Sequence, residues 1–324
     1  MLTVVIQPPK VGVVILNYNG AEEVLHCLEA LRESRTGNRR VWVVDNDSTD
    51  GSKEALPPAL FGEETWLETG ANLGYAGGNN AGIREALAWG AEYILILNPD
   101  CEVEAGFLPP LLRALEAVPR AGIACPLILE EDGVTVQSLG GEASLWTGRC
   151  RRRLHGRPAD GPGLPRWSEV DFPHGACMLL KRSFLEEAGL LNEAYFLYYE
   201  DVELGLRARR EVWKTLAIPN SRVRHRDTTK RGIASPVVTY FGTRNQAWVV
   251  AEYGRLWHHM SFLFLSCCLR WPLKTASRLL RGRFRASWAV VRGAWDGVWS
   301  KAWRDSRHTA LPRAGRLRRM PNVV

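Results

Sequence analysis

The sequence of 324 residues contains only seven cysteines, an odd number, and no two of them form a CxxC pair. Scattered single cysteines build neither a disulfide framework nor a zinc site, and they are typical of a protein kept in a reducing compartment. The N-terminus has no basic segment followed by an apolar one, which a secretory signal would require. We therefore expect a cytoplasmic protein without disulfides.

Long apolar runs are also missing. The stretch 256–273 has an apolar centre of only about ten residues from Met260, and Arg270 and Pro272 close it. A helix needs about 20 apolar residues to cross a bilayer, so this stretch is too short to span one.

Two kinds of motif from other enzyme classes are absent. The glycine-rich loop predicted over 72–80 lacks the GxGxxG spacing of dinucleotide-binding folds. No Ser-His-Asp or Cys-His arrangement suggests a covalent nucleophile. Gly74, Gly77 and Gly78 would instead let the backbone approach something bulky or anionic, such as a diphosphate.

What the sequence does have is a very uneven charge. From residue 241 onward there are 16 Lys and Arg residues against 3 Asp and Glu residues, and seven of the 13 tryptophans. Because the whole chain carries +7, residues 1–240 are net acidic. We expect one domain over 1–240 and a basic, Trp-rich helical extension over 241–324.

The extension favours a membrane surface. Arginines interleaved with Trp288 and Trp295 are typical of a helix that lies in the membrane interface, where anionic lipid attracts each cation by about 1 kcal/mol. The apolar insertion is expected from Trp257, Phe262, Phe264 and Trp271. A helical pair packed on the body with a solvated basic face is the alternative. Nucleic acid is disfavoured, because the body is acidic and has no nucleic-acid motif.

The body alternates short apolar segments with stretches of helical spacing, which predicts an α/β fold with a parallel, doubly wound sheet. Strands are expected at 11–16, 41–44, 65–68, 93–97, 122–129, 172–181 and 214–218, helices at 21–32 and 82–89, a helix capped by Ser183 that contains Glu186, and a mobile loop at 140–165. Polar residues follow the strands, at the edge where such sheets bind ligands.

The strand 93–97 stops at Asn98-Pro99-Asp100. Proline cannot continue a central strand, so Asp100 is presented just beyond the sheet. With Glu102 it could hold a hard divalent cation through oxygen ligands. An ordinary turn is the alternative.

A second acidic group, Glu200, Asp201 and Glu203, follows an aromatic run that begins at Tyr195. A carboxylate at a helix start beside apolar surroundings is a candidate for catalysis, although many helices begin with carboxylates. His225, flanked by arginines at a strand end, is a candidate for metal or phosphate, although a lone histidine is more often structural.

The series VVILNYNG, VVDNDSTDGS, NLGYAGGNNAGI, ILILNPDCEV, HGACMLLKRSF and YFLYYEDVELGLR resembles the family 2 glycosyltransferases, over roughly residues 10–245. The resemblance implies the GT-A nucleotide-sugar-binding fold with a mostly parallel central sheet flanked by helices, and inverting transfer from a nucleotide sugar. Within the family the chain is most similar to the rhamnosyltransferase branch, which uses dTDP-L-rhamnose to build cell-surface polysaccharide.

The resemblance also implies roles for single residues. Asp100 matches the metal-binding Asp of the DxD motif, with Asn98 in place of its first Asp, and His225 matches a histidine that completes the metal site in some members; the metal would be Mg²⁺ or Mn²⁺. Asp201, in the pair Glu200-Asp201, matches the catalytic base. The residues implied for the donor site are Asn17, Tyr18, Asn19, Asp45, Asn72, Gly74, Asn79 and Asn98.

We therefore expect an enzyme that moves a sugar to a saccharide or polyprenyl-diphosphate-linked acceptor at the inner face of the cell membrane. The basic extension would bind the anionic membrane surface. A non-catalytic nucleotide- or carbohydrate-binding relative is the alternative, as is a transferase that uses a UDP- or GDP-sugar.

Overall fold

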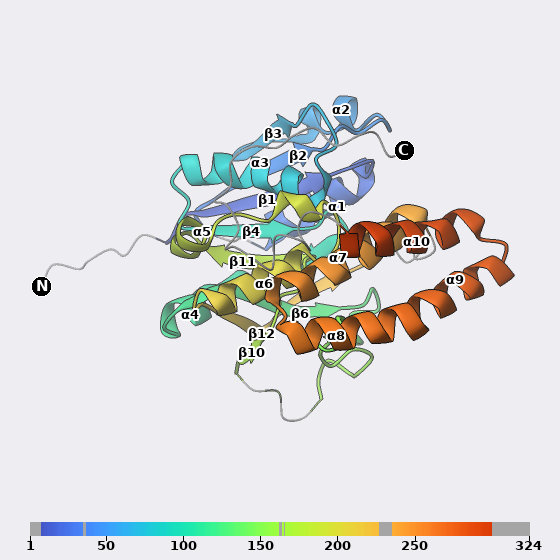
Figure 1. The fold of residues 1–324 in the computed structure, drawn as a ribbon. Coiled ribbons are helices and arrows are strands. Elements are labelled where there is room, and N and C mark those ends of the chain that lie inside the picture. Colours follow the sequence, from blue (N-terminus) through green and yellow to red (C-terminus); the bar gives the residue numbers. More distant parts are fainter. Residues whose placement is uncertain (1–7, 35–36, 162–163, 165, 227–234, 300–324) are drawn as a thin grey trace, which may run out of the picture.

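The protein is described by a computed structural model that covers residues 8–34, 37–161, 164, 166–226 and 235–299. Its centre is a ten-stranded sheet in the order β10-β12-β6-β11-β4-β1-β2-β3, with β5 added to β12 and β7 to β6 (Figure 1). A separate hairpin joins β8 and β9. The strands are β1 (Val11–Asn17), β2 (Arg39–Asp45), β3 (Glu64–Glu68), β4 (Tyr93–Leu97), β5 (Cys101–Val103), β6 (Ala121–Leu129), β7 (Val136–Ser138), β8 (Gly141–Ser144), β9 (Arg149–Arg152), β10 (Ser168–Val170), β11 (Cys177–Lys181) and β12 (Lys214–His225).

Helices cover both faces of the sheet. One face packs its apolar side chains against α1 and α4, and the other packs against α3, α5 and α6. The helical segments are α1 (Ala21–Glu33), α2 (Ser52–Ala55), η1 (Pro57–Ala59), α3 (Gly74–Ala88), α4 (Leu108–Ala117), α5 (Arg182–Ala188), η2 (Glu193–Tyr195), α6 (Glu200–Arg210), α7 (Pro236–Tyr253), α8 (Leu256–Leu265), the π-helical η4 (Ser266–Arg270), α9 (Trp271–Leu280) and α10 (Phe284–Trp299).

The predicted α/β fold is confirmed, and its first half is parallel as expected. Strands β4, β1, β2 and β3 pair in parallel, so that their carboxyl ends meet at one edge. Strand β11 then runs antiparallel to both β4 and β6, which makes the complete sheet mixed. The reversal brings the loop that precedes β11 to the edge where β4 ends.

Several predicted boundaries were wrong. The stretch 74–80 belongs to α3 and not to a loop, because its glycines let the helix pack closely on the sheet: a side chain at Gly78 would collide with Leu16 of β1. The stretch 140–165, predicted to be a mobile loop, contains the β8–β9 hairpin in its first half. The strand predicted at 172–181 begins only at Cys177.

Two further segments differ from the expectation. Lys181 and not Ser183 is the N-cap of α5, and no side chain caps it. Strand β12 continues past residue 218 as far as His225, with an irregularity in its pairing to β6 before Arg222. This longer strand carries His225 to the edge of the sheet.

The C-terminal helices pack on the body. The predicted domain boundary at residue 240 falls inside α7, which packs against α6 through Val249. In Figure 1, α9 and α10 form a helical pair that reaches beyond the sheet, and α10 returns to lie along α7, where Gly293 faces the Tyr240 carbonyl. Over the part of the chain that is described, no helix is both long enough and apolar enough to cross a bilayer.

The two faces of the extension differ. Of the four aromatic residues expected to insert into a membrane, Phe262 and Trp271 are buried between the helices, so that expectation was wrong for them. Trp257 and Phe264 are exposed, at 67% and 66%. Packing on the body and exposure of apolar side chains therefore occur in the same helices.

Candidate functional site

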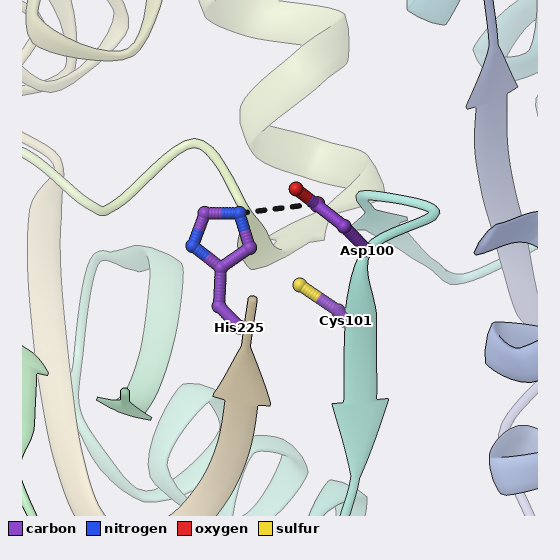
Figure 2. Close-up of side chains that lie close together, drawn as sticks. All are labelled: Asp100, Cys101 and His225. Atoms are coloured by element: carbon purple, nitrogen blue, oxygen red, sulfur yellow. Dashed lines mark ion pairs between the residues drawn. The ribbon is translucent and has the colours of Figure 1, made fainter. Parts of the chain in front are cut away.

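The turn after β4 places Asp100 at the edge of the sheet. The Asn98 backbone N–H donates to the Ala176 carbonyl at 2.8 Å, and the Cys101 N–H closes the turn on the Asn98 carbonyl at 3.1 Å. Strand β12 pairs with β5 so that His225 lies opposite Cys101. The His225 Nε2 atom is 3.1 Å from an Asp100 carboxylate oxygen (Figure 2).

The imidazole of His225 is held in this orientation by a buried amide. Its Nδ1 atom lies 2.7 Å from Oε1 of Gln137 in β7, and both side chains are buried. Because an amide oxygen only accepts, Nδ1 carries the hydrogen, and Nε2 is directed at Asp100. Such an outer hydrogen bond is the usual support of a metal-ligating histidine. Nothing in the sequence pointed to Gln137, which is 88 residues away from His225.

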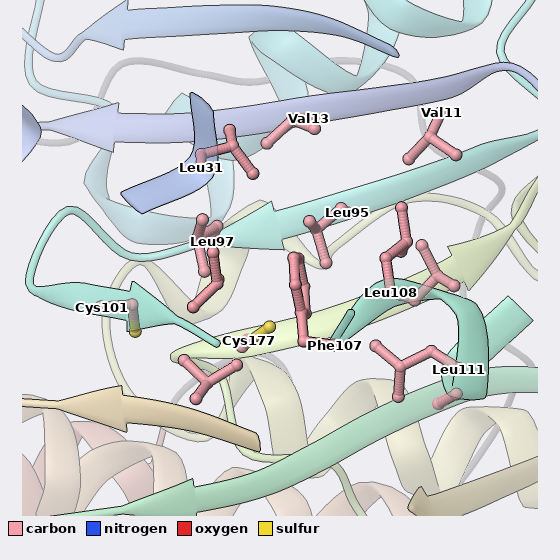
Figure 3. Close-up of a cluster of buried hydrophobic side chains, with 14 of the residues drawn as sticks. Val11, Val13, Leu31, Leu95, Leu97, Cys101, Phe107, Leu108, Leu111 and Cys177 are labelled. Carbon is pink, nitrogen blue, oxygen red and sulfur yellow. The ribbon is translucent and has the colours of Figure 1, made fainter. Parts of the chain in front are cut away.

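Neighbours of Asp100 in the sequence take other roles. The Sγ atom of Cys101 lies within 4.8 Å of the ligand atoms of Asp100 and His225, but Cys101 belongs to the apolar core cluster with Leu97 and Cys177 (Figure 3). Burial raises the pKa of the Cys101 thiol well above its usual value, which keeps it protonated. The expectation that Glu102 helps to hold the cation was wrong. In the pairing of β5 with β12, Glu102 lies opposite Arg224, on the face away from His225, and it forms an ion pair with Arg224 at 2.5 Å.

Asp100 and His225 form a reasonable donor set for a divalent cation. Together they offer a carboxylate oxygen and an imidazole nitrogen, a combination that suits Mn²⁺ or another borderline ion better than Mg²⁺. Together with Cys101 they form the one group of three possible ligands that lies close enough to share an ion among the described residues. Because Asp100 and His225 would supply only two ligands, water and a diphosphate would have to supply the other ligands of the cation.

The loop 172–176 connects the candidate metal ligands Asp100 and His225 to the second acidic group. The ring of His174 stacks edge-on against His225, with 5.7 Å between centroids, and burial lowers the pKa of His174 so that it stays neutral. The next backbone N–H, that of Gly175, donates to Asp201 Oδ2 at 3.0 Å. A side chain at residue 175 would crowd Asp201 and the hydroxyl of Tyr75. His174 therefore contacts the candidate metal ligand His225, and the adjacent Gly175 contacts Asp201.

Asp201 lies in the first turn of α6. Its Oδ1 atom accepts from the Val202 N–H at 2.8 Å, while Oδ2 accepts from Gly175. Burial raises the pKa of Asp201, and these backbone hydrogen bonds and the charge of Arg152 oppose the rise. A carboxylate with a raised pKa that remains ionised is a stronger proton acceptor than an exposed one.

Glu200 differs from its neighbour. It is 5% exposed, and its Oε2 atom has no hydrogen-bond partner among the described residues. Burial and the charge of Asp201 raise the pKa of Glu200 well above its usual value. Glu200 is therefore the member of the pair that stays protonated, and Asp201 is the member that can accept a proton.

The aromatic run before Asp201 has an unusual backbone. Phe196, Tyr198 and Tyr199 have φ values of 62°, 66° and 68°, in the left-handed region that residues with side chains seldom adopt. The buried amide of Asn245 in α7 donates to the carbonyls of Tyr195, Leu197 and Tyr198, at 2.8, 2.9 and 2.7 Å. Sequence reasoning missed Asn245, because nothing local distinguishes it from any polar residue of a helix.

The ends of β1 and β2 form a closed polar network. The Asn17 amide donates to Asp45 at 2.9 Å and to Ser48 at 3.0 Å, and all three residues are buried. Asn19 accepts from the Thr49 N–H at 2.7 Å, and Tyr18 is 53% exposed. Asn17 and Asp45 thus shape the two turns, while Tyr18 is free to contact a ligand.

The third part of this edge surrounds the start of α3. Asn72 accepts from the Gly74 N–H at 2.9 Å and from the Asn46 amide at 3.0 Å. The amide of Asn79 donates to the Tyr75 carbonyl, and its oxygen is buried without a partner among the described residues. The glycines expected to admit a ligand pack against protein instead: a side chain at Gly74 would strike Phe196, and one at Gly78 would strike Leu16.

The predicted site residues therefore gather along one edge of the sheet. Asn17, Asp45 and Asn98 lie at the ends of the neighbouring strands β1, β2 and β4, and Asp100, His225 and Asp201 follow on both sides of the loop before β11. Arrangements of this kind can bind a nucleotide, hold a cation and accept a proton at adjoining positions.

Comparison with known proteins identifies the sequence family of this chain. Residues 12–189 match the sequence family described as Glycosyl transferase family 2. A low-salt glycan biosynthesis hexosyltransferase, Agl10 of Haloferax volcanii, is 32% identical over 201 residues, which are 62% of each chain. An N-acetylglucosaminyl-diphospho-decaprenol L-rhamnosyltransferase of Mycobacterium tuberculosis is 30% identical over 243 residues, with 68% of this chain and 77% of the relative covered.

Solved structures share the fold. The crystal structure of GalNAc-T7 with UDP, GalNAc and Mn²⁺ superposes with a TM-score of 0.63 at 17% identity, over 94% of this chain and 58% of that one. This likeness shows the GT-A fold alone, since the identity is low. The chain spans less than two thirds of the length of GalNAc-T7 and of the Haloferax relative.

Proposed function

This chain belongs to glycosyl transferase family 2, and from that premise we propose that it is an inverting hexosyltransferase with Asp201 as its general base. In the finer form of the proposal, it moves L-rhamnose from dTDP-L-rhamnose to a saccharide acceptor carried on a polyprenyl diphosphate. The Mycobacterium relative, named as a rhamnosyltransferase that acts on such a lipid-linked sugar, supports this choice of donor and acceptor.

One observation carries the proposal. Gly175 contacts Asp201 at 3.0 Å, while the adjacent His174 stacks on His225, which is paired with Asp100. A proton acceptor and a pair of candidate metal ligands therefore lie on either side of one short loop. An inverting transfer requires the base and the leaving diphosphate to be on opposite sides of the sugar. The arrangement of Asp201 and the candidate metal ligands around this loop suits that requirement.

Asp201 would take the proton of the acceptor hydroxyl as the hydroxyl oxygen attacks the anomeric carbon. A sugar hydroxyl is a poor nucleophile at neutral pH, so removal of its proton in the transition state lowers the barrier. The new C–O bond forms as the bond to the diphosphate oxygen breaks, and the electron pair leaves with the nucleoside diphosphate. Burial keeps Glu200 protonated, which limits the local negative charge to Asp201.

Asp100 and His225 would hold a divalent cation, Mn²⁺ or Mg²⁺. When bound, such an ion neutralises negative charge on a leaving diphosphate as a Lewis acid. Gln137 would keep the His225 imidazole turned toward it. Asn98, which replaces the first acid of the family's motif, adds no charge and lies half-buried at the start of the turn.

The ends of β1, β2 and α3 would hold the nucleotide. The exposed ring of Tyr18 can stack on the base, and the closed network of Asn17 and Asp45 would set the shape of the turns that surround it. Asn19, Asn72 and Asn79 would line the remainder of the donor site.

Exposed side chains of α8 and α10 would contact the inner surface of the cell membrane. Trp257, Phe264, Trp288 and Trp295 are each about two thirds exposed, and arginines lie between them. Aromatic and basic side chains on one helical surface are typical of interfacial membrane binding. Residues 241–299 of the predicted extension would then form a membrane contact of the catalytic domain, although α7 itself is anchored in that domain; residues 300–324 lie outside the described part of the chain.

The test of the proposed function is a thermal-shift panel of dTDP-, UDP- and GDP-sugars with Mn²⁺, followed by a transfer assay. We expect dTDP-L-rhamnose to raise the melting temperature most. Asp45→Ala should abolish that shift, whereas Asp47→Ala, an exposed carboxylate in the same turn, should leave it unchanged. If no nucleotide sugar shifts the melting temperature of the wild type, the donor proposal is refuted.

A further inference from the structure

A group of cations joins the β8–β9 hairpin to the C-terminal helices. The Arg270 Nη1 atom donates to the Thr147 carbonyl in the hairpin turn at 2.7 Å, which brings Arg149 of β9 near Arg270 and Lys274. Two further contacts hold the hairpin turn on the helices. Gln246 donates to the Gly148 carbonyl at 2.7 Å, and the ring of Phe262 lies against Gly148. The hairpin and the helices are therefore held together at this point.

No acidic side chain among the described residues neutralises these cations. Among the described residues, no carboxylate forms an ion pair with Arg149, Arg270, Lys274 or Arg278, whereas Arg153, just after β9, and Arg292 in α10 each have one. Burial, and then the charges of Arg278, Arg270 and Arg149, lower the pKa of Lys274. Cations that repel one another at a fixed junction favour the binding of a polyanion.

Exposed apolar side chains lie next to these cations in the sequence. Leu269 and Leu273, each next in sequence to one of the cations, are 52% and 66% exposed, and Phe264 is 66% exposed. A ligand that joins a compact anion to a long apolar chain would match both features at once.

The hairpin also leads from the cations to the base. Arg149 and Arg152 are the first and last residues of β9, about 10 Å apart at roughly 3.3 Å per residue. The charge of Arg152 acts on both Asp201 and His174. An anion held near Arg149 would therefore lie one short strand along the hairpin from Arg152, whose charge reaches the proton acceptor.

We propose that Arg149, Arg270 and Lys274 form the binding site for the diphosphate of a prenyl-linked acceptor, with its hydrocarbon chain along Leu269 and Leu273. The proposal rests on the proposed function for the identity of the acceptor. It goes further by naming the residues that select a lipid diphosphate over a free saccharide, and by assigning the hairpin and the extension to one shared site.

The test uses the full chain and farnesyl diphosphate in neutral detergent micelles as the probe, with binding measured by calorimetry. Arg149→Gln is the informative variant, because Arg149 is exposed, forms no side-chain hydrogen bond among the described residues, and lies outside the membrane-contact helices. We expect its dissociation constant for farnesyl diphosphate to rise at least tenfold, and Lys274→Gln to have a similar effect. Arg157→Gln, another exposed arginine of the same region, is the matched control and should change it less than threefold.

Two further probes distinguish other sources of the same anion. Binding of dTDP should stay within threefold of the wild type in Arg149→Gln, since the donor site is elsewhere. Binding to phosphatidylglycerol vesicles should also stay within threefold, since the helices keep their own cations. Circular dichroism and the melting temperature establish that each variant is folded.

The outcomes separate clearly. If Arg149→Gln and Lys274→Gln both bind farnesyl diphosphate as tightly as the wild type does, or if Arg149→Gln loses vesicle and diphosphate binding equally, the site is not one for a prenyl diphosphate. If the full chain binds farnesyl diphosphate no better than farnesol, the proposal is likewise refuted. Failure of the proposed function would appear separately, as an absence of nucleotide-sugar binding.

Discussion

Replacing Asn245 with alanine tests how the C-terminal helices support the catalytic loop. Asn245 is fully buried in α7, and its amide donates to three carbonyls of the segment before Asp201. Three residues of that segment have left-handed backbone angles, each of which costs roughly 1 kcal/mol or more. The amide therefore holds a backbone that would otherwise relax.

The magnitude follows from the partners that remain. Arg244 also donates to the Tyr195 carbonyl, at 3.1 Å, so the loss falls mainly on the carbonyls of Leu197 and Tyr198. At about 1 kcal/mol for each lost hydrogen bond, with a small further cost for the cavity, Asn245→Ala should lower the free energy of unfolding by about 2–3 kcal/mol. Urea denaturation, followed by circular dichroism, measures this change.

The same variant should also impair transfer, because the loop determines where Asp201 lies. We expect kcat to fall at least about tenfold, in line with the sensitivity of catalysis to small misplacements, while dTDP affinity stays within threefold. Gln246→Ala, which removes one hydrogen bond from the next residue to the hairpin, is the control for stability and should lower the free energy of unfolding by only about 1 kcal/mol. A loss of less than about 0.5 kcal/mol, on the scale of ordinary surface substitutions, together with a normal kcat would refute the reasoning.

Three other predictions concern the base, the cation and a buried acid. Asp201→Asn should reduce transfer by at least about 100-fold with donor binding nearly intact; because burial raises the pKa of Asp201 and the carboxylate is the active form, a pH–rate profile of the wild type should lose activity on the acid side at a pH above the ordinary Asp value. Asp100→Ala should abolish stimulation by Mn²⁺ and weaken dTDP binding more than thymidine binding in titration calorimetry, and full activity of the wild type in EDTA would contradict this. Burial, followed by the charge of Glu203, raises the pKa of Glu252 from 4.5 to about 7, so the folded state holds the extra proton between these values and stability should fall as the pH rises through this window. Glu252→Gln should remove a penalty on the order of 2–3 kcal/mol above pH 7; urea denaturation at pH 5 and pH 8 should show a gain only at pH 8.

The sequence by itself determined the elements whose signal is local. The β-branched run of β1 and the apolar runs of β2 and β4 are buried on both faces, and the helical spacing of α1 is equally plain, so the parallel half of the sheet and its polar edge could be predicted. Pro99 ended β4 as expected, because its ring cannot continue a central strand. Six motifs in order were enough to identify the family.

Only the tertiary structure decided how distant segments meet. The antiparallel direction of β11, the pairing of β5 with the end of β12 and the reach of Gln137 to His225 depend on contacts between segments up to 122 residues apart, such as Arg224 with Glu102. No local pattern encodes such a contact. The same holds for Asn245 of α7, which in the sequence is one polar residue among many. It holds also for the aromatic run before Asp201, whose carbonyls accept hydrogen bonds from Asn245. The left-handed angles of this run are stable only because a helix from the far end of the chain supplies the hydrogen bonds that hold them.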